Sequence, residues 1–148
     1  MAAGSTTVLH GTGIRSIPMG AIVLLGRLFY ALIFLMAAPG NFTKQGIAYA
    51  ASQGVPLASI GVPLMGVISL VGGLSILLGY RARIGACFIA LFLLVVTPVM
   101  HKFSGLTDPM MAQMQMINFM KNLSMFGGAL LITQFGAGPL SLDARRSL

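Results

Sequence analysis

The stretch "AIVLLGRLFYALIFLMAAPG", residues 21–40, decides the class of this protein, because only Arg27 interrupts a long run of apolar side chains. As an α-helix rising about 1.5 Å per residue, such a run crosses the roughly 30 Å hydrocarbon core of a bilayer. A charge at the bilayer centre costs roughly 2.5–3.5 kcal/mol on insertion scales. Arg27 therefore needs a polar partner, a water-filled cavity or a place near the interface.

The composition of the whole chain also favours a membrane protein. Its 148 residues match one domain, and charged residues make up only 7%, against about 25% in ordinary soluble domains. Apolar types reach 57%. The net charge of +7 does not indicate nucleic-acid binding, because no basic cluster with interleaved aromatic residues occurs. The single cysteine, Cys87, lies in an apolar run and forms no internal disulfide.

Three more apolar runs follow the first, so the predicted spans cover residues 17–38, 57–79, 84–100 and 117–135. Lipid offers no hydrogen-bond partners, and helices satisfy their backbone groups internally. The arginines flanking the spans all fall on one predicted side, which the positive-inside rule makes cytoplasmic. They are Arg15, Arg81, Arg83, Arg145 and Arg146. We predict an all-α transmembrane four-helix bundle with both termini cytoplasmic. A mobile N-terminal segment is expected at residues 1–16, the four spans within 17–136, and a cytoplasmic tail at 137–148.

Small residues predict where the spans touch, because helices in lipid associate by close packing rather than by hiding apolar surface from water. Gly66, Ser69, Gly72 and Gly73 make a groove along the second span. Ser69 fits this packing face, or alternatively contacts a ligand. In the fourth span, Ser124 and Gly128 are read as a packing pair.

Arg27 has two interpretations. In the first, it snorkels to an interface or marks a segment shifted along the membrane normal. In the second, it turns into the bundle near the midplane to meet carbonyls, polar side chains or a ligand. The only carboxylates, Asp108 and Asp143, belong to an outer loop and the inner tail. Neither is an obvious partner for Arg27, so a ligand, a water cavity or another subunit is favoured.

A second set of polar residues lies in "QMQMINFMKNLSMFGG", residues 113–128. Asn118, Lys121 and Asn122 follow at i, i+3 and i+4 and share one helix face. Lys121 either snorkels to the outer interface or joins the two amides at the mouth of a polar pocket. His101, at the end of the third span, is an interfacial residue or a group that exchanges protons with a quinol or water.

The sequence offers little for intrinsic catalysis. Methionines in "PMMAQMQM", residues 109–116, suit Cu(I), but their spacing is irregular and no cysteine or second histidine is near, so no metal site is predicted. No nucleophile motif, C-x-x-C or phosphate loop occurs. Enzymatic activity is left open, at most as a subunit of an oxidoreductase.

Several segments together resemble the DoxX family of small four-span membrane proteins. They are "LLGRLFYALIF", "QGVP", "GGLSILLGYRARIGA", "HKF", "QMQMINFMKNLSMFGG" and "GPLSLD", in this order between residues 18 and 143. The resemblance implies a bundle in the inner membrane of a bacterium or archaeon and a link to quinol oxidation or thiosulfate–quinone electron transfer. Arg27, His101, Lys121 and Asn122 match polar positions of the family pattern. Ser69 stands where many members carry an acidic residue, which weakens any expectation of intrinsic redox chemistry.

Two functions follow as expectations. In the first, the chain is a quinone- or quinol-associated subunit that binds a small amphipathic ligand through Arg27, His101, Asn118, Lys121, Asn122 and Ser69. It has no intrinsic cofactor, so a partner must carry electrons. In the second, it is a non-enzymatic accessory subunit that stabilises a larger membrane complex. The expected partners are the lipid bilayer with other membrane subunits or further copies of the chain, and no nucleic acid.

Overall fold

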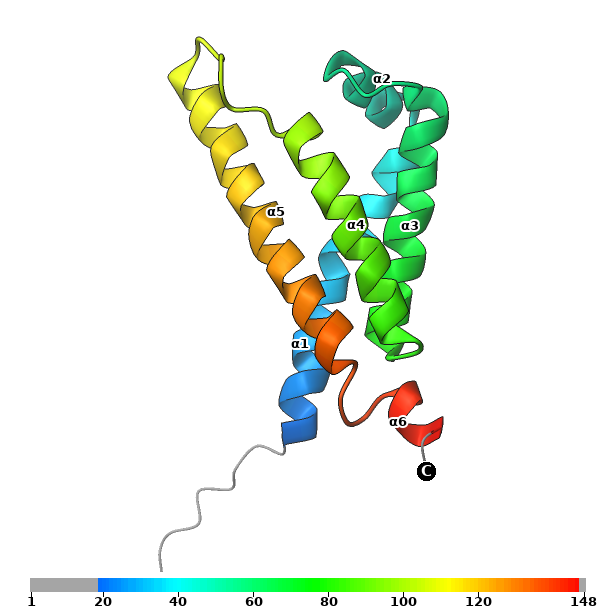
Figure 1. Cartoon of the computed structure of the whole chain (residues 1–148). Coiled ribbons are helices and arrows are strands. Elements are labelled where there is room, and N and C mark those ends of the chain that lie inside the picture. The colour runs from blue at the N-terminus through cyan, green and yellow to red at the C-terminus, as the bar shows by residue number, and fades with distance from the viewer. Residues whose placement is uncertain (1–18, 147–148) are drawn as a thin grey trace, which may run out of the picture.

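The computed structural model describes residues 19–146, and all regular structure in that range is helical (Figure 1). The elements are α1 (Met19–Ala37), η1 (Ala38–Phe42), α2 (Lys44–Ser52), α3 (Ala58–Leu78), α4 (Ala82–Met100), α5 (Pro109–Phe135) and α6 (Leu142–Arg146). The predicted mobile segment, residues 1–16, lies outside the described residues.

Three stretches are long and apolar enough to cross a membrane: Met19–Phe42, Ala58–Leu78 and Ala82–Met100. This confirms the all-α membrane class. α5 is the longest helix, at 27 residues, but it is not among the three. Asn118, Lys121 and Asn122 lie within it and lower its apolar content. The fourth span and the side on which the termini lie therefore stay predictions.

The bundle has two ends, which we name by their residues. The arginine end holds the α3–α4 turn with Arg81, the first turn of α4 with Arg83, and the C-terminal segment (residues 136–146). The loop end holds α2 and the connection between α4 and α5 (Figure 1). α5 begins at the loop end and finishes at the arginine end, so it runs alongside the whole of α4 (Figure 1).

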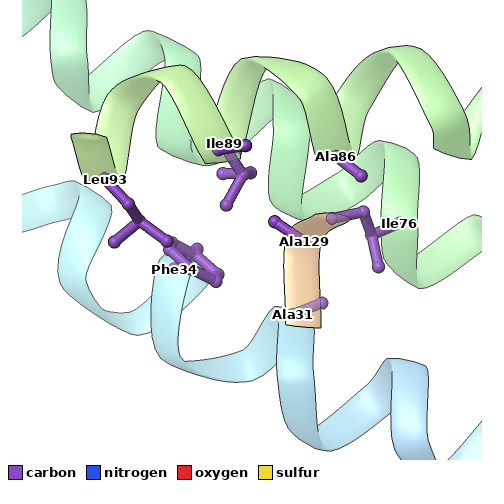
Figure 2. Packing of buried hydrophobic residues seen from close by; sticks show 8 residues of the cluster. Ala31, Phe34, Ile76, Ala86, Ile89, Leu93 and Ala129 are labelled. Atoms are coloured by element: carbon purple, nitrogen blue, oxygen red, sulfur yellow. The ribbon is translucent and has the colours of Figure 1, made fainter. Parts of the chain in front are cut away.

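The core lies where α1, α3, α4 and α5 meet, as Figure 2 shows. Its buried side chains are Ala31, Phe34, Ile76, Ala86, Ile89, Ala90, Leu93 and Ala129. Small residues allow this approach, as predicted for the second span. A β-carbon on Gly72 would come within 2.8 Å of Ile89 Cγ1, and one on Gly73 within 3.0 Å of Leu35 Cδ2. α3 thus packs against α4 on one side and α1 on the other.

Contact between α1 and α5 depends on Tyr30. Its hydroxyl donates a 2.6 Å hydrogen bond to the Met125 carbonyl, and its ring lies against Gly128. The Gly128 half of the predicted packing pair is therefore confirmed. Ser124 is exposed, and its hydroxyl donates to the Met120 carbonyl of its own helix. The pair does not form one packing face, because only Gly128 lies against another helix, whereas Ser124 is exposed.

The connection between the first two spans is helical rather than a plain loop. After η1, the Thr43 hydroxyl accepts a 3.0 Å hydrogen bond from the Gly46 amide and so caps α2. A β-carbon on Gly46 would collide with the Gly40 carbonyl. α2 therefore folds back over the loop end, where Ala50 packs with Ala58 and Val62 of α3.

Candidate functional site

Arg27 is buried, with 4% of its side chain exposed, and it lies at the arginine end. Its Nη2 donates a 2.7 Å hydrogen bond to the Leu140 carbonyl of the C-terminal segment. A β-carbon on Gly79, in the α3–α4 turn, would overlap Nη1. Arg27 is therefore level with the ends of α3 and α5, rather than near the midplane. This matches the alternative of a helix shifted along the normal, and it keeps the charge close to a membrane interface.

The C-terminal segment folds under the bundle and holds this end together. The Asp143 carboxylate accepts hydrogen bonds from the Arg81 amide at 2.8 Å and the Ala82 amide at 3.0 Å, and so caps α4 from a distant part of the chain. The Asp143 amide donates to the Gly79 carbonyl at 2.8 Å. The negative charge of Asp143 also acts on Arg27. The tail that offered no obvious partner for Arg27 thus supplies a carbonyl and a nearby carboxylate.

Two donors of Arg27, Nε and Nη1, are buried without a hydrogen-bond partner. A buried cation that is only partly satisfied is a poor source of stability, because desolvation offsets much of what its bonds contribute. The hydrogen bond that Arg27 does make positions the C-terminal segment.

The α3–α4 turn carries a further cation–aromatic contact. The Arg146 guanidinium lies 4.6 Å from the centre of the Tyr80 ring. Interaction with Arg146 lowers the pKa of the exposed Tyr80 phenol, and the charge of Arg81 acts in the same direction. This contact adds a second attachment of the tail to the turn.

His101 lies at the loop end, far along the bundle from Arg27. Its Nδ1 is 2.9 Å from the Gln115 Oε1, which joins the end of α4 to α5. The neutral or protonated ring can donate this bond, so the contact fits an interfacial histidine as well as one that exchanges protons. His101 and Arg27 therefore lie at different ends of the bundle and are not brought together.

Lys121 is exposed, and its ammonium donates a 3.0 Å hydrogen bond to Asn118 Oδ1, one turn nearer the loop end. At about 1.5 Å per residue it lies roughly 9 Å along α5 from Gln115. Its side chain points toward the loop end, as expected of a lysine that snorkels to the outer interface. Asn122, on the same turn, is instead buried, with 7% exposed. The three residues thus divide between the surface and the interior.

Ser69 lies buried in the middle of α3, with 2% exposed. The six predicted ligand residues therefore occupy different levels of the bundle and both its interior and its surface. The expectation that Arg27 shares one cavity with the outer polar groups is not met. Whether any of the six binds a ligand stays a prediction.

A cavity lies elsewhere, at the loop end between α2, α3 and α4. Its volume is about 610 Å³, within the roughly 300–1,000 Å³ of small-molecule sites. None of the six predicted residues lines it. Val62 and Met65 of α3 face Val96 and Val99 of α4 across it. The described lining residues carry no charge.

The polar side chains among the lining residues all come from residues 41–49, in η1, α2 and the residue between them, and we call this part of the lining the rim. They are Asn41, Thr43, Gln45 and Tyr49. The Thr43 hydroxyl is already used in capping α2, so the amides of Asn41 and Gln45 and the phenol of Tyr49 are the groups that can orient a ligand. Sequence reasoning missed them because the connection was taken as a loop. The available signal was Thr43, a residue type favoured at helix N-caps, ahead of the alanine-containing stretch "KQGIAYAAS", residues 44–52.

Within residues 19–146, no three histidine, cysteine, aspartate or glutamate side chains come together as metal ligands do. The cavity is apolar with a neutral polar rim. Such an arrangement suits a neutral amphipathic molecule, since a charged one would lose its hydration without an opposite charge in return.

The fold and cavity define a helical integral membrane protein, and comparison with known proteins places it further. The DoxX family model matches residues 22–102, and the chain belongs to the DoxX family. It is 34% identical to "Inner membrane protein YqjF" of Escherichia coli (strain K12) over 123 residues, which cover 82% of this chain and 88% of that one. It is 29% identical to "Inner membrane protein YphA" of the same organism over 126 residues, covering 84% and 89%. No solved structure matches the chain.

Proposed function

We propose that this DoxX-family protein is a four-span inner-membrane protein that binds a small amphipathic ligand of the quinone type in the cavity between α2, α3 and α4. The observation that carries the proposal is the cavity itself, with an aliphatic wall and a neutral polar rim. A quinone matches both parts, because its ring carbonyls accept hydrogen bonds from amides and a phenol while its tail prefers aliphatic side chains.

The inner membrane is proposed because both relatives carry that location in their names. The fourth span is supported by the course of α5. Gln115 contacts His101 at the end of α4, and the segment after Phe135 contacts the turn before α4. Between Gln115 and Phe135 the helix rises roughly 30 Å, the thickness of the hydrocarbon core. The arginine end then faces the cytoplasm by the positive-inside rule, with the C-terminus on that side.

By binding a quinone, the chain acts as the quinone-associated subunit of a redox complex. The described cavity lining contains no redox-active cysteine and no histidine. The residues bind and orient the quinone and exclude water from it. Electron transfer requires a partner that carries a redox cofactor.

The proposal is tested by filling the cavity with a larger side chain. Val96→Phe places a ring among the lining side chains of α4, and Leu94→Phe adds the same ring on the exposed face of that helix. Purified chains in nanodiscs are titrated with a short-chain ubiquinone. We expect Val96→Phe to weaken binding at least about tenfold, a loss of about 1.4 kcal/mol, and Leu94→Phe to leave it unchanged. Equal binding by both variants and the unmodified chain contradicts a ligand in this cavity.

The same titration examines the residues predicted from sequence. Lys121→Ala and Arg27→Ala are compared with Asn41→Ala. If the rim binds the quinone, Asn41→Ala weakens quinone binding. If the residues predicted from the sequence bind it, Arg27→Ala or Lys121→Ala weakens quinone binding instead. If only Lys121→Ala weakens it, the ligand binds beside α5 and the cavity assignment is wrong.

A second candidate function, an accessory subunit, is favoured by the surface of α5. The exposed Lys121 lies on a helix whose side chains are largely exposed along the loop-end half. A larger complex could cover this face and provide an acid or carbonyl for the ammonium. Native mass spectrometry distinguishes the two functions: a chain that is stable alone and takes up quinone supports the first. A chain that carries no small molecule and is stable only with another polypeptide supports the second.

A further inference from the structure

Positive charge at the arginine end is not balanced by the chain itself. The described cations there are Arg27, Arg81, Arg83, Arg145 and Arg146, and the one described acid is Asp143. The sequence has only two acidic side chains, and the second, Asp108, caps α5 at the loop end through the Met110 amide at 2.9 Å. Among residues 19–146, no further acidic side chain is left to neutralise the arginine end.

The carboxylate of Asp143, the one described acid at the arginine end, already has hydrogen-bond partners. Both oxygens of Asp143 accept hydrogen bonds from backbone amides at the start of α4. Arg146 lies over Tyr80, and Arg27 donates to the Leu140 carbonyl. Arg83 has no acidic partner among residues 19–146 and belongs to the first turn of a helix that can cross a membrane.

Arg83 lies at the wall of a second cavity, which we call the arginine-end pocket. It has a volume of about 340 Å³ and lies between the start of α4, the end of α5 and the C-terminal segment. Its lining includes Arg83, Phe135, Gly136, Gly138, Ser141 and Asp143. A β-carbon on Gly136 would approach Arg83 Nε to 3.2 Å, so the guanidinium packs closely against that backbone.

The pocket combines a cation, Arg83, with an apolar neighbour and with the carboxylate of Asp143, whose two oxygens already accept hydrogen bonds from backbone amides. Phe135 lines it and has 74% of its side chain exposed. At the start of α4 the pocket is level with the membrane interface in the proposed orientation, where phosphate groups of lipids lie. At about 30 Å³ per water molecule, 340 Å³ corresponds to roughly ten waters, which is ample for a phosphate group.

We infer that the arginine-end pocket binds the phosphate of an anionic phospholipid, with Arg83 as the main contact and Phe135 beside the first part of the acyl chains. A guanidinium matches phosphate because its planar donors bind two oxygens at once. Basic pockets between helices at this depth are suited to anionic lipid headgroups. A free phosphate ion shares this chemistry, but it makes no use of Phe135.

The test uses the full chain purified in detergent and native mass spectrometry with added phosphatidylglycerol or phosphatidylcholine. We expect the chain to retain phosphatidylglycerol preferentially. Arg83→Gln is expected to weaken that retention roughly tenfold, the effect of losing one charge-assisted hydrogen bond. Arg83→Lys keeps the charge and is expected to restore part of it.

Lys102→Gln is the matched control, because it removes one exposed positive charge at the loop end. It is expected to leave phosphatidylglycerol retention unchanged. Circular dichroism melts of each variant verify that the bundle is folded. Equal retention of the two lipids, or equal loss in Arg83→Gln and Lys102→Gln, overturns the proposal. Displacement of phosphatidylglycerol by an equal concentration of inorganic phosphate overturns the lipid as the source and assigns the pocket to a soluble anion.

Discussion

Arg27 and Asp143 join parts of the chain that lie far apart in sequence. Arg27 donates to the Leu140 carbonyl, and the Asp143 carboxylate caps α4. The C-terminal segment is therefore attached through one buried cation and one carboxylate, in addition to the buried Ala137. Neither residue lies at the cavity between α2, α3 and α4. Their substitution is expected to change the anchoring of the tail and to spare ligand binding.

Arg27→Ala is expected to release the C-terminal segment. Loss of the Leu140 bond removes one of the contacts that hold residues 137–146 under the bundle, the others being those of Asp143 and Arg146. Hydrogen exchange of this segment, followed by mass spectrometry, should be at least about tenfold faster, as a loss of about 1.4 kcal/mol implies. Arg145→Ala removes an exposed arginine from the same end and is the control. Equal protection in both variants means that the tail does not depend on Arg27.

Asp143→Ala removes the cap of α4. Two amides lose their acceptor, so we expect a loss of about 1 kcal/mol in the free energy of unfolding, typical of a lost N-cap. Asp143→Asn keeps one acceptor oxygen and should cost less. Reversible unfolding in mixed micelles measures both. An unchanged unfolding free energy for Asp143→Ala contradicts a stabilising cap.

At the scale of elements, α3 is the helix on which the others assemble. Its glycines let α4 approach on one side and α1 on the other. In lipid, such close approach takes the place of the hydrophobic driving force that packs helices in water. Sequence reasoning found this role because glycine and serine are conspicuous among large apolar residues. It could not tell which glycine faces which neighbour.

Two glycine substitutions should have opposite effects. Gly72→Ala places a methyl group within 3 Å of Ile89, so we expect the bundle to lose about 1 kcal/mol or more of stability. Gly26→Ala meets no atom within 4 Å on α1 and is expected to gain up to about 1 kcal/mol from helix propensity. Unfolding in mixed micelles measures both, and a stabilising Gly72→Ala contradicts the tight α3–α4 contact.

At the scale of the whole molecule, the path of α5 decides the topology. Since the segment after α5 contacts the α3–α4 turn, α5 must run from the loop end to the arginine end whenever α3 and α4 cross the membrane. The polar residues 118–122 make this helix less apolar than its neighbours without shortening it. An experiment that determines on which side of the membrane each end of α5 lies therefore tests the fourth span directly.

We expect the connection between α4 and α5 and the C-terminal segment to label from opposite sides of the membrane. In a Cys87→Ser background, Ser104→Cys should react with an impermeant maleimide in cells whose outer membrane alone is opened. Arg145→Cys should react only after the inner membrane is opened. The same chain with Cys87→Ser alone gives the background. Labelling of both positions from one side means that α5 does not cross.

At the scale of the whole molecule, the cavity between α2, α3 and α4 was not predicted from the sequence. The spans at 57–79 and 84–100 agree closely with α3 and α4, whereas α5 begins at Pro109, well before the expected 117. Nothing in the run "GIAYAASQGVP", residues 46–56, states that α2 turns back over the ends of its neighbours. The Thr43 cap is local and starts α2, but the position of α2 depends on the packing of Ala50 against Ala58 and Val62 of α3, which forms only when the chain folds.

The sequence by itself determined that the chain is helical and lies in a membrane, because long apolar runs and few charges are compatible with little else. It also determined the family and which end collects the arginines. The tertiary structure alone decided that Arg27 meets the Leu140 carbonyl, that Ser69 is buried, and that a cavity opens beside α2. The physical reason is that in lipid both faces of a helix are apolar. The pattern of side chains therefore says that a helix crosses the membrane, but not which of its faces meets protein.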